Sequence, residues 1–280
     1  AEDAYVVASE PYGVVELTAD FVRMDGETPA DPDDPGASRG QIMELDGARA
    51  GTLDGMVRRS YDGRSLPVTD ADVARAEITT RDIDRGDHPH FLLKEISESP
   101  DSVRATLRGR LVPDGAGMDG WRVRLGDEAL GTDVRSGLAD GSIRRILVIG
   151  QGTAAVAGGS VARALEAELA GHDGILVENL PATELSGFGL TPDMSDTLVV
   201  AISQSGTTTD TNRTVDLVRT RGARVVAIVN RRNSDLVDRA DGVLYTSDGR
   251  DVEMSVASTK AFYAQAVAGN LLAVAVADAA

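Results

Sequence analysis

The sequence contains no cysteine, which excludes disulfides, thiolate metal sites and a cysteine nucleophile within this chain. Lysine is nearly absent and occurs only at Lys94 and Lys260. Aromatic residues make up 4% of the chain, so the core must rest on Val, Leu, Ile and Ala. The formal net charge of −17 argues against binding to nucleic acid or to an anionic membrane surface, because both require clustered cations. The net charge does not exclude a small phosphorylated ligand. Solvent ions screen distant charges, so a pocket binds mainly through its own hydrogen-bond donors.

The chain is long enough for one large domain or two modest ones. Its first residues resemble neither an initiator methionine nor a signal peptide, so we expect a fragment of a longer protein. Residues 261–279 form an apolar, alanine-rich run that Gln265 and Asn270 interrupt. We interpret this run as a buried or interface helix and not as a membrane span.

Residues 1–80 are rich in Asp, Gly and Pro and contain short strand-like runs at 5–8, 21–24 and 41–45. The segment 27–40 is typical of a loop insertion. We expect strands and loops here, without enough apolar mass to fold alone.

A helix is predicted from Ser99, because Pro100 and Asp101 are typical of a first turn. Val103, Leu107 and Leu111 then recur at i, i+4 and i+8, which predicts one apolar stripe facing a core.

From about residue 142 onward, apolar strand-like runs alternate with helical patterns. The expected strands are 145–149, 174–177, 196–202, 224–229 and 242–246. Such alternation predicts an α/β domain with a five-stranded parallel sheet and helices on both faces. Ligands bind such sheets beyond the carboxyl ends of the strands.

The third predicted strand runs directly into residues 203–210, of which seven of eight carry a side-chain hydrogen-bonding group. Gly206 allows close approach of the backbone, and the next helix presents free N–H groups at its start. Ser and Thr are also ordinary helix caps. We interpret the whole run as a receptor for a phosphate group that needs neither Lys nor Arg.

The first predicted strand ends in Gly150 and Gly152, which alone is a weak signal. The third glycine of the dinucleotide fingerprint is missing, although Glu178 keeps a nicotinamide-dependent Rossmann enzyme as an alternative.

The last helix is entered through residues 253–262. Ser255 or Ser258 is expected to cap it, which places Lys260 in its first turn. A cation there opposes the helix dipole, so Lys260 is either solvated or paired, with Glu253 or a ligand anion as the candidate partner.

Taken together, these segments resemble the first isomerase lobe of the isomerising glutamine–fructose-6-phosphate aminotransferases. Residues 203–208 resemble the phosphate loop of that family, residues 256–262 its sugar-contacting helix start, and residues 89–96 the segment that enters the lobe. Residues 6–10 and 21–26 resemble the tail of the preceding glutaminase domain. The resemblance implies a glutaminase-like remnant over 1–80 and a sugar isomerase (SIS) domain over 81–280, a three-layer sandwich of the flavodoxin type.

The resemblance also implies roles for particular residues. The residues expected to hold the phosphate of a sugar are Ser203, Gln204, Ser205, Thr208, Gly152 and Thr153. Those expected at the sugar are Val256, Ser258 and Lys260. The sequence departs from the family at three positions, because Gln151 replaces a cysteine, Ala154 a phosphate-binding serine and Thr207 a glutamate. Loss of one hydroxyl would weaken phosphate binding by about 0.5–1.5 kcal/mol, which leaves a different sugar phosphate open.

The family's acid–base glutamate, ring-opening histidine and Schiff-base lysine belong to a second isomerase lobe and a C-terminal tail. We therefore expect no catalytic residue, metal or cofactor in this chain, which would bind fructose 6-phosphate or a related sugar phosphate and be inactive alone. The alternatives are a non-catalytic phosphosugar sensor and a paralogue acting on another sugar phosphate. The resemblance implies a cytoplasmic protein, and the apolar run 261–279 predicts a homodimer or docking to a second lobe.

Overall fold

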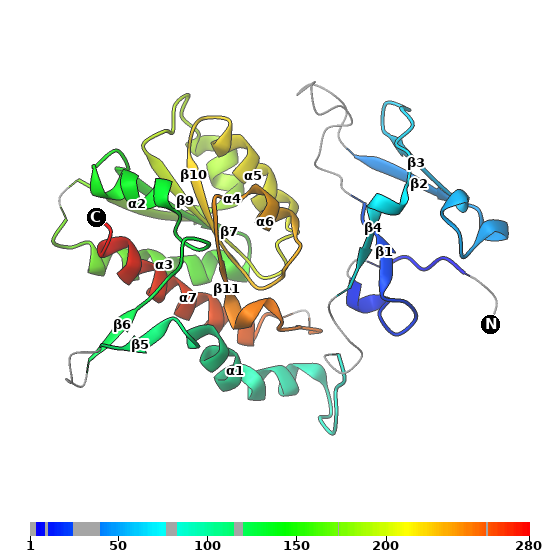
Figure 1. Cartoon of the computed structure of the whole chain (residues 1–280), viewed down its shortest axis with the longest axis horizontal. Helices are drawn as coiled ribbons and strands as arrows, with labels where there is room; N and C mark the ends of the chain where they lie inside the picture. Colours follow the sequence, from blue (N-terminus) through cyan, green and yellow to red (C-terminus); the bar gives the residue numbers. More distant parts are fainter. Residues whose placement is uncertain are drawn as a thin grey trace. The chain divides into compact units, whose positions relative to one another are not determined.

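The structure, a computed structural model, describes residues 4–8, 11–24, 40–76, 83–114, 120–172, 174–255 and 257–280. The chain divides into two compact units, Ala1–Asp84 and Arg85–Ala280, which are described separately. Figure 1 shows the elements of each unit.

The first unit contains two antiparallel strand pairs. One pair is β1 (Asp20–Val22) with β4 (Val73–Arg75), and the other is β2 (Gln41–Leu45) with β3 (Met56–Ser60). Short 3-10 turns lie at η1 (Pro11–Gly13), η2 (Gly47–Arg49), η3 (Leu53–Gly55) and η4 (Asp70–Asp72). In the described part of this unit the buried hydrophobic side chains are Val14 and Ile83, in line with the small apolar mass of the sequence.

The strand predicted at residues 5–8 is wrong. This segment has extended backbone outside any sheet, and Val7 is 80% exposed. The Tyr5 hydroxyl lies 2.8 Å from the Arg49 carbonyl oxygen and 2.6 Å from that of Thr52. A side chain, and not a strand ladder, therefore anchors the segment. Of the predicted insertion at 27–40, only Gly40 lies within the described residues.

The second unit is built on the predicted five-stranded parallel sheet, in the order β11-β10-β9-β7-β8. The strands are β7 (Arg145–Gly150), β8 (Leu176–Pro181), β9 (Thr197–Ser203), β10 (Arg224–Val229) and β11 (Gly242–Tyr245). In chain order this is the doubly wound 2-1-3-4-5 arrangement, so the α/β prediction is confirmed.

Helices cover both faces of the sheet, which makes three layers (Figure 1). Alternate β9 side chains face opposite sides: Leu198, Val200 and Ile202 join one core cluster, and Val199 and Ala201 the other. The first cluster is completed by α2 (Thr132–Ala139), α3 (Thr153–Glu168) and α7 (Lys260–Ala277). The second is completed by α4 (Ala182–Glu184), α5 (Thr209–Arg219) and α6 (Asp235–Arg239). A π-helical turn, η5 (Leu185–Gly189), and the 3-10 turn η6 (Thr246–Gly249) lie in the connections.

Helix α7 is long and apolar enough to cross a membrane by length and composition alone, but most of it is buried inside this unit. It packs against α3 and α1 (Phe91–Leu107), with Ala268, Leu272 and Val276 fully buried. Most of the apolar run is therefore part of the core, although Tyr263 within it is 55% exposed. Whether the chain associates stays a prediction.

The predicted start of the first helix is wrong. Helix α1 begins at Phe91, capped by His90, whose Nδ1 accepts the Leu93 N–H at 3.3 Å. Pro100 lies inside the helix, where it removes one backbone hydrogen bond at a cost of about 3 kcal/mol. Tertiary contacts on both sides of Pro100, described below, offset that cost. Leu111 is not helical and begins β5 (Leu111–Pro113), which pairs with β6 (Trp121–Val123).

Candidate functional site

The site lies where the direction of chain winding reverses. Strands β7 and β9 are hydrogen-bonded neighbours, yet the helix after β7 packs on one face of the sheet and the helix after β9 on the other. The two connections therefore diverge at the carboxyl ends of these strands and leave a crevice between them. In doubly wound sheets this is the position where ligands bind.

A cavity of about 210 Å3 occupies this position. It is lined by Gln151, Thr153, Ala154, Ile202, Ser203, Gln204, Ser205, Thr208, Ser258 and Gln265. All ten are neutral, and most offer a hydroxyl or an amide. The cavity therefore suits a small polar ligand recognised by hydrogen bonds and not by opposite side-chain charge.

The connection from β9 to α5 is a tight turn held by its own side chains. Ser203 Oγ accepts the Gly206 N–H at 3.0 Å and lies 3.3 Å from Thr208 Oγ1. Ser205 Oγ accepts the backbone N–H of Thr207 at 3.2 Å and its hydroxyl at 2.9 Å. These bonds hold the hydroxyls in place before any ligand arrives.

Gly206 is required at the centre of this turn for two reasons. Its φ of +67° is a backbone conformation that L side chains rarely adopt. An added Cβ would also lie 2.1 Å from Ser234 Oγ. The Gly206 carbonyl oxygen accepts the Asn212 side-chain amide at 3.1 Å and the Leu236 N–H at 3.0 Å, so α5 and α6 both hold the turn.

Two helices begin at the cavity. Helix α3 starts at Thr153, directly after Gly152, whose φ is +58°, and α5 starts directly after Thr208. The first N–H groups of a helix have no acceptor within it, and its dipole places roughly half a positive charge at that end. Two helix starts thus place backbone donors and positive potential beside a cavity whose lining has no cationic side chain.

The cap of α7 differs from the prediction. Neither Ser255 nor Ser258 is its N-cap, which is Thr259. The Glu253 carboxylate performs the capping, because its Oε1 accepts the N–H groups of Thr259 at 2.7 Å and Ala261 at 3.1 Å. Ser258 Oγ donates to Glu253 Oε2 at 3.2 Å, and Ser258 also lines the cavity. An acidic residue at a helix start is favoured by the dipole, which explains why Glu253 stays there instead of pairing with Lys260.

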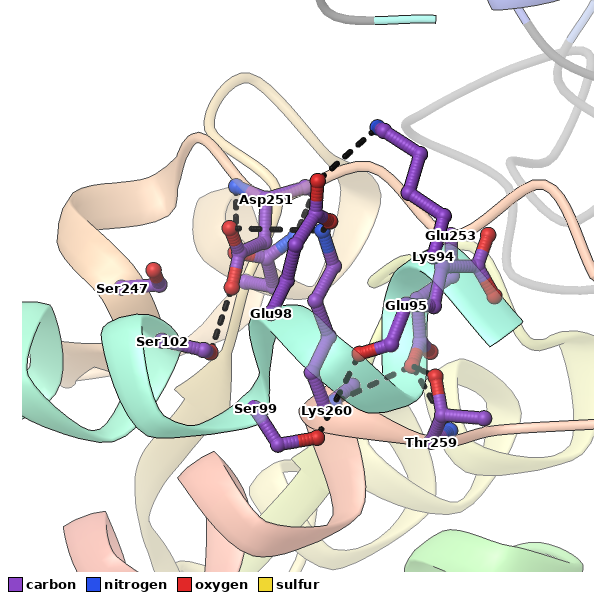
Figure 2. Close-up of polar contacts among 12 residues, drawn as sticks. Lys94, Glu95, Glu98, Ser99, Ser102, Ser247, Asp251, Glu253, Thr259 and Lys260 are labelled. Atoms are coloured by element: carbon purple, nitrogen blue, oxygen red, sulfur yellow. Dashed lines mark hydrogen bonds and ion pairs between the residues drawn. The ribbon is translucent and has the colours of Figure 1, made fainter. Parts of the chain in front are cut away.

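Lys260 lies outside the cavity lining, in a buried cluster of charges beside α1 (Figure 2). Its Nζ lies 2.7 Å from Glu98 Oε2 and 3.7 Å from Asp251 Oδ1. Lys94 reaches the other oxygen of Glu98 at 3.0 Å. The partners proposed from the sequence, Glu253 or a ligand anion, are therefore not the ones that hold this lysine.

The charges in this cluster shift each other's pKa. Burial by itself would raise the pKa of Glu98, but hydrogen bonds from Lys260 and Lys94 outweigh it and lower this pKa from 4.5. Burial would lower the pKa of Lys260, but the charge of Asp251 and the bond to Glu98 outweigh it and raise this pKa above 10.5. Both groups are therefore charged at neutral pH.

A second glutamate of α1, Glu95, is only 1% exposed and holds the chain that approaches the cavity. Its Oε1 accepts the N–H of Met254 at 2.5 Å and that of Ser255 at 3.1 Å, and the Ser255 hydroxyl donates to Oε2. On the other side of Pro100, the Ser102 hydroxyl donates to Asp251 Oδ2 at 2.5 Å. Helix α1 therefore fixes residues 251–255, which lead to Ser258.

The structure brings six of the predicted site residues to one cavity: Thr153, Ser203, Gln204, Ser205, Thr208 and Ser258. Gly152 lies between two lining residues, and Lys260 is held elsewhere. Val256 lies outside the described residues. Sequence reasoning missed Gln265, although it shares the apolar stripe of Ala261, Ala264 and Ala268, where a polar side chain is unusual.

Comparison with known proteins identifies the class of this fold. Residues 142–275 match the SIS domain family, so this part of the chain is a SIS domain. It is homologous to the isomerising glutamine–fructose-6-phosphate aminotransferases. It is 42% identical to that of Symbiobacterium thermophilum over 72% of this chain and 30% of the relative. It is 34% identical to that of Streptomyces coelicolor over 97% of this chain and 38% of the relative. The chain thus spans about a third of the length of these relatives.

A solved structure shows the same fold. The C-terminal domain of glucosamine-fructose-6-phosphate aminotransferase from Francisella tularensis superposes with a TM-score of 0.58 and 27% identity, covering 70% of this chain and 50% of that one.

Proposed function

We propose that this chain is the sugar-phosphate-binding portion of an isomerising glutamine–fructose-6-phosphate aminotransferase, and that the cavity between β7 and β9 binds the phosphate of fructose 6-phosphate. The observation that carries the proposal is the turn at 203–208. It places the side chains of Ser203, Gln204, Ser205 and Thr208 on one cavity wall at the start of α5. The homology to this enzyme class over most of the chain supports the choice of ligand.

Electrostatics make the proposal physically reasonable despite the net charge of −17. Bulk charge is screened over roughly 8–10 Å, so donors lining a pocket dominate. Two helix starts and four polar side chains can take the place of arginine or lysine around a phosphate dianion.

We propose that the chain binds and does not itself catalyse. None of the ten residues that line the cavity is an acid or a base that titrates near neutral pH. Proton transfer to and from the sugar, and delivery of ammonia, would therefore come from other parts of a whole enzyme. Binding of the phosphate by this chain would contribute to catalysis by positioning the reacting carbon at the far end of the sugar. Residues 1–80 would be a glutaminase-like remnant, and such an enzyme would work in the cytoplasm.

The test is calorimetric titration of the chain with fructose 6-phosphate, glucosamine 6-phosphate and NAD. We expect both sugar phosphates to bind and NAD not to bind. Ser205→Ala should weaken sugar-phosphate binding about 10-fold or more, because hydrogen bonds to charged groups are worth about 1.5–3 kcal/mol. The matched control is Ser136→Ala, an exposed serine on α2 outside the cavity, which should change nothing. Binding of NAD, or sugar-phosphate binding unaffected by Ser205→Ala, would overturn the proposal.

A further inference from the structure

Gln265 is the most unusual member of the cavity lining. It belongs to α7, whose other buried residues are almost all small or aliphatic, and it is 1% exposed. Its Nε2 has no hydrogen-bond acceptor among the described residues. A buried amide left in this state costs free energy, so it is retained where something else satisfies it.

A second amide in the same cavity shows the same feature. The Oε1 of Gln151, at the carboxyl end of β7, is also buried and has no donor among the described residues. The unpaired atom of Gln265 is thus a donor on α7, and the unpaired atom of Gln151 is an acceptor just after β7. Both residues line the cavity together with the turn at 203–208.

The pair suits a hydroxyl-bearing ligand. A hydroxyl both donates and accepts, so it satisfies either end of a glutamine amide. A phosphate oxygen only accepts, and the turn at 203–208 with the start of α5 already provides donors for one. Gln265 lies on a different element, beyond the first turn of α7 and away from its helix start.

The geometry points to Gln265 as a ligand-contacting, specificity-determining residue that hydrogen-bonds a hydroxyl of the sugar, while the turn at 203–208 holds the phosphate. This assignment rests on the proposed function of the cavity and deepens it. It separates the site into a phosphate part and a hydroxyl part on different secondary-structure elements.

The test compares fructose 6-phosphate with inorganic phosphate, each titrated into the full 280-residue chain and into its Gln265→Met variant. Methionine keeps the unbranched shape and removes the amide. We expect the variant to lose about 3- to 10-fold in affinity for fructose 6-phosphate, as for one lost hydrogen bond, and to keep its affinity for inorganic phosphate. Because Nε2 has no protein partner, the Tm of the ligand-free variant should not fall.

The control on the same helix is Asn270→Leu, an exposed amide outside the cavity lining that donates to the Ala266 carbonyl oxygen, and it should leave both affinities unchanged. Equal losses for both ligands in Gln265→Met, or no loss for either, would overturn the assignment while leaving the phosphate site intact. A wild-type chain that binds neither ligand would overturn the proposed function, and the assignment would fall with it.

Discussion

The ammonium group of Lys260 lies 2.7 Å from a carboxylate oxygen of Glu98, although the two residues are 162 positions apart in the chain. The lysine is 4% exposed and begins α7, whereas the glutamate lies in the middle of α1 (Figure 2). This ion pair joins α1, the first helix of the second unit, to α7, its last helix. It also keeps a buried cation beside the start of α7, where the helix dipole alone would disfavour it.

Removing the charge of Glu98 should destabilise the fold in a pH-dependent way. The folded pKa of Glu98 is lowered from 4.5, so its charge stabilises the fold above that pH, and the stabilisation is lost as pH falls through the folded pKa. Glu98→Gln should lower the free energy of unfolding at pH 7 by about 1–2 kcal/mol, less than a fully buried pair because Glu98 is partly exposed. Urea unfolding at pH 7, 5, 4 and 3 measures this difference.

The free-energy difference between wild type and Glu98→Gln should begin to narrow below about pH 4.5, where Glu98 of the unfolded chain takes up a proton, and should close as pH falls through the lower folded pKa, below which both side chains are neutral. The pKa of Lys260 is raised above 10.5, so its contribution persists through neutral pH and is lost only as pH rises through that higher value. Asp101→Asn, at a side chain that is 83% exposed, is the control and should change stability little. A gap that stays constant down to pH 3 would show that the charge of Glu98 is not what stabilises the fold.

Replacing Glu95 should loosen the segment that leads to the cavity. Glu95→Leu leaves the Met254 and Ser255 N–H groups and the Ser255 hydroxyl without their acceptor, which should cost about 3 kcal/mol or more. We expect faster hydrogen exchange at Met254 and Ser255 and weaker binding of fructose 6-phosphate. Glu95→Gln keeps one carbonyl oxygen in place and should recover most of the loss. Unchanged exchange in Glu95→Leu would contradict a positioning role.

The turn at 203–208 should not tolerate a side chain at Gly206. Gly206→Ala combines a positive φ with a Cβ placed 2.1 Å from Ser234 Oγ, and should lower the free energy of unfolding by about 2 kcal/mol or more. Binding of inorganic phosphate should weaken as well. Gly171→Ala, where an added Cβ meets nothing within 4 Å, is the control. Ser234→Gly in the Gly206→Ala background should recover part of the stability, and no recovery would show that the steric contact is not the cause.

Helices α3 and α7 are packed closely enough to require glycine at 269. A Cβ on Gly269 would lie 2.1 Å from Val161 Cγ2, so Gly269→Ala should destabilise by about 1–3 kcal/mol although alanine favours helices. Gly159→Ala on α3, with its nearest neighbour at 3.8 Å, should instead stabilise by up to about 1 kcal/mol.

A double-mutant cycle tests the Gly269–Val161 contact directly. Val161→Ala removes the methyl groups in the way, so the double variant should be more stable than the sum of the two single effects predicts. Thermal unfolding of the four proteins measures the coupling, and additive effects would mean that the helices shift apart instead.

The architecture of the second unit was predictable because its cause is local. Runs such as 225–229 are apolar over a strand's length, and the structure has β10 (Arg224–Val229) there. The hydroxyl-rich turn was predictable because the residues from Ser203 to Thr208 are consecutive in the sequence, between the end of one apolar strand and the start of one helix. Errors occurred where local signals compete with distant contacts. Pro100 is typical of a helix start, but α1 continues through it because Glu95 and Ser102 bond to residues far along the chain.

The sequence by itself determined the alternation of strands and helices, the parallel sheet that follows from it, and the polar turn at the end of β9, since each depends on interactions within a few residues. Only the tertiary structure decided that Lys260 pairs with Glu98, that Glu95 holds residues 254 and 255, and that Gln265 reaches the cavity. These outcomes depend on how α1 and α7 pack against each other and the sheet. A side chain's partners across 159–162 residues are set by that packing and leave no periodic trace in the sequence.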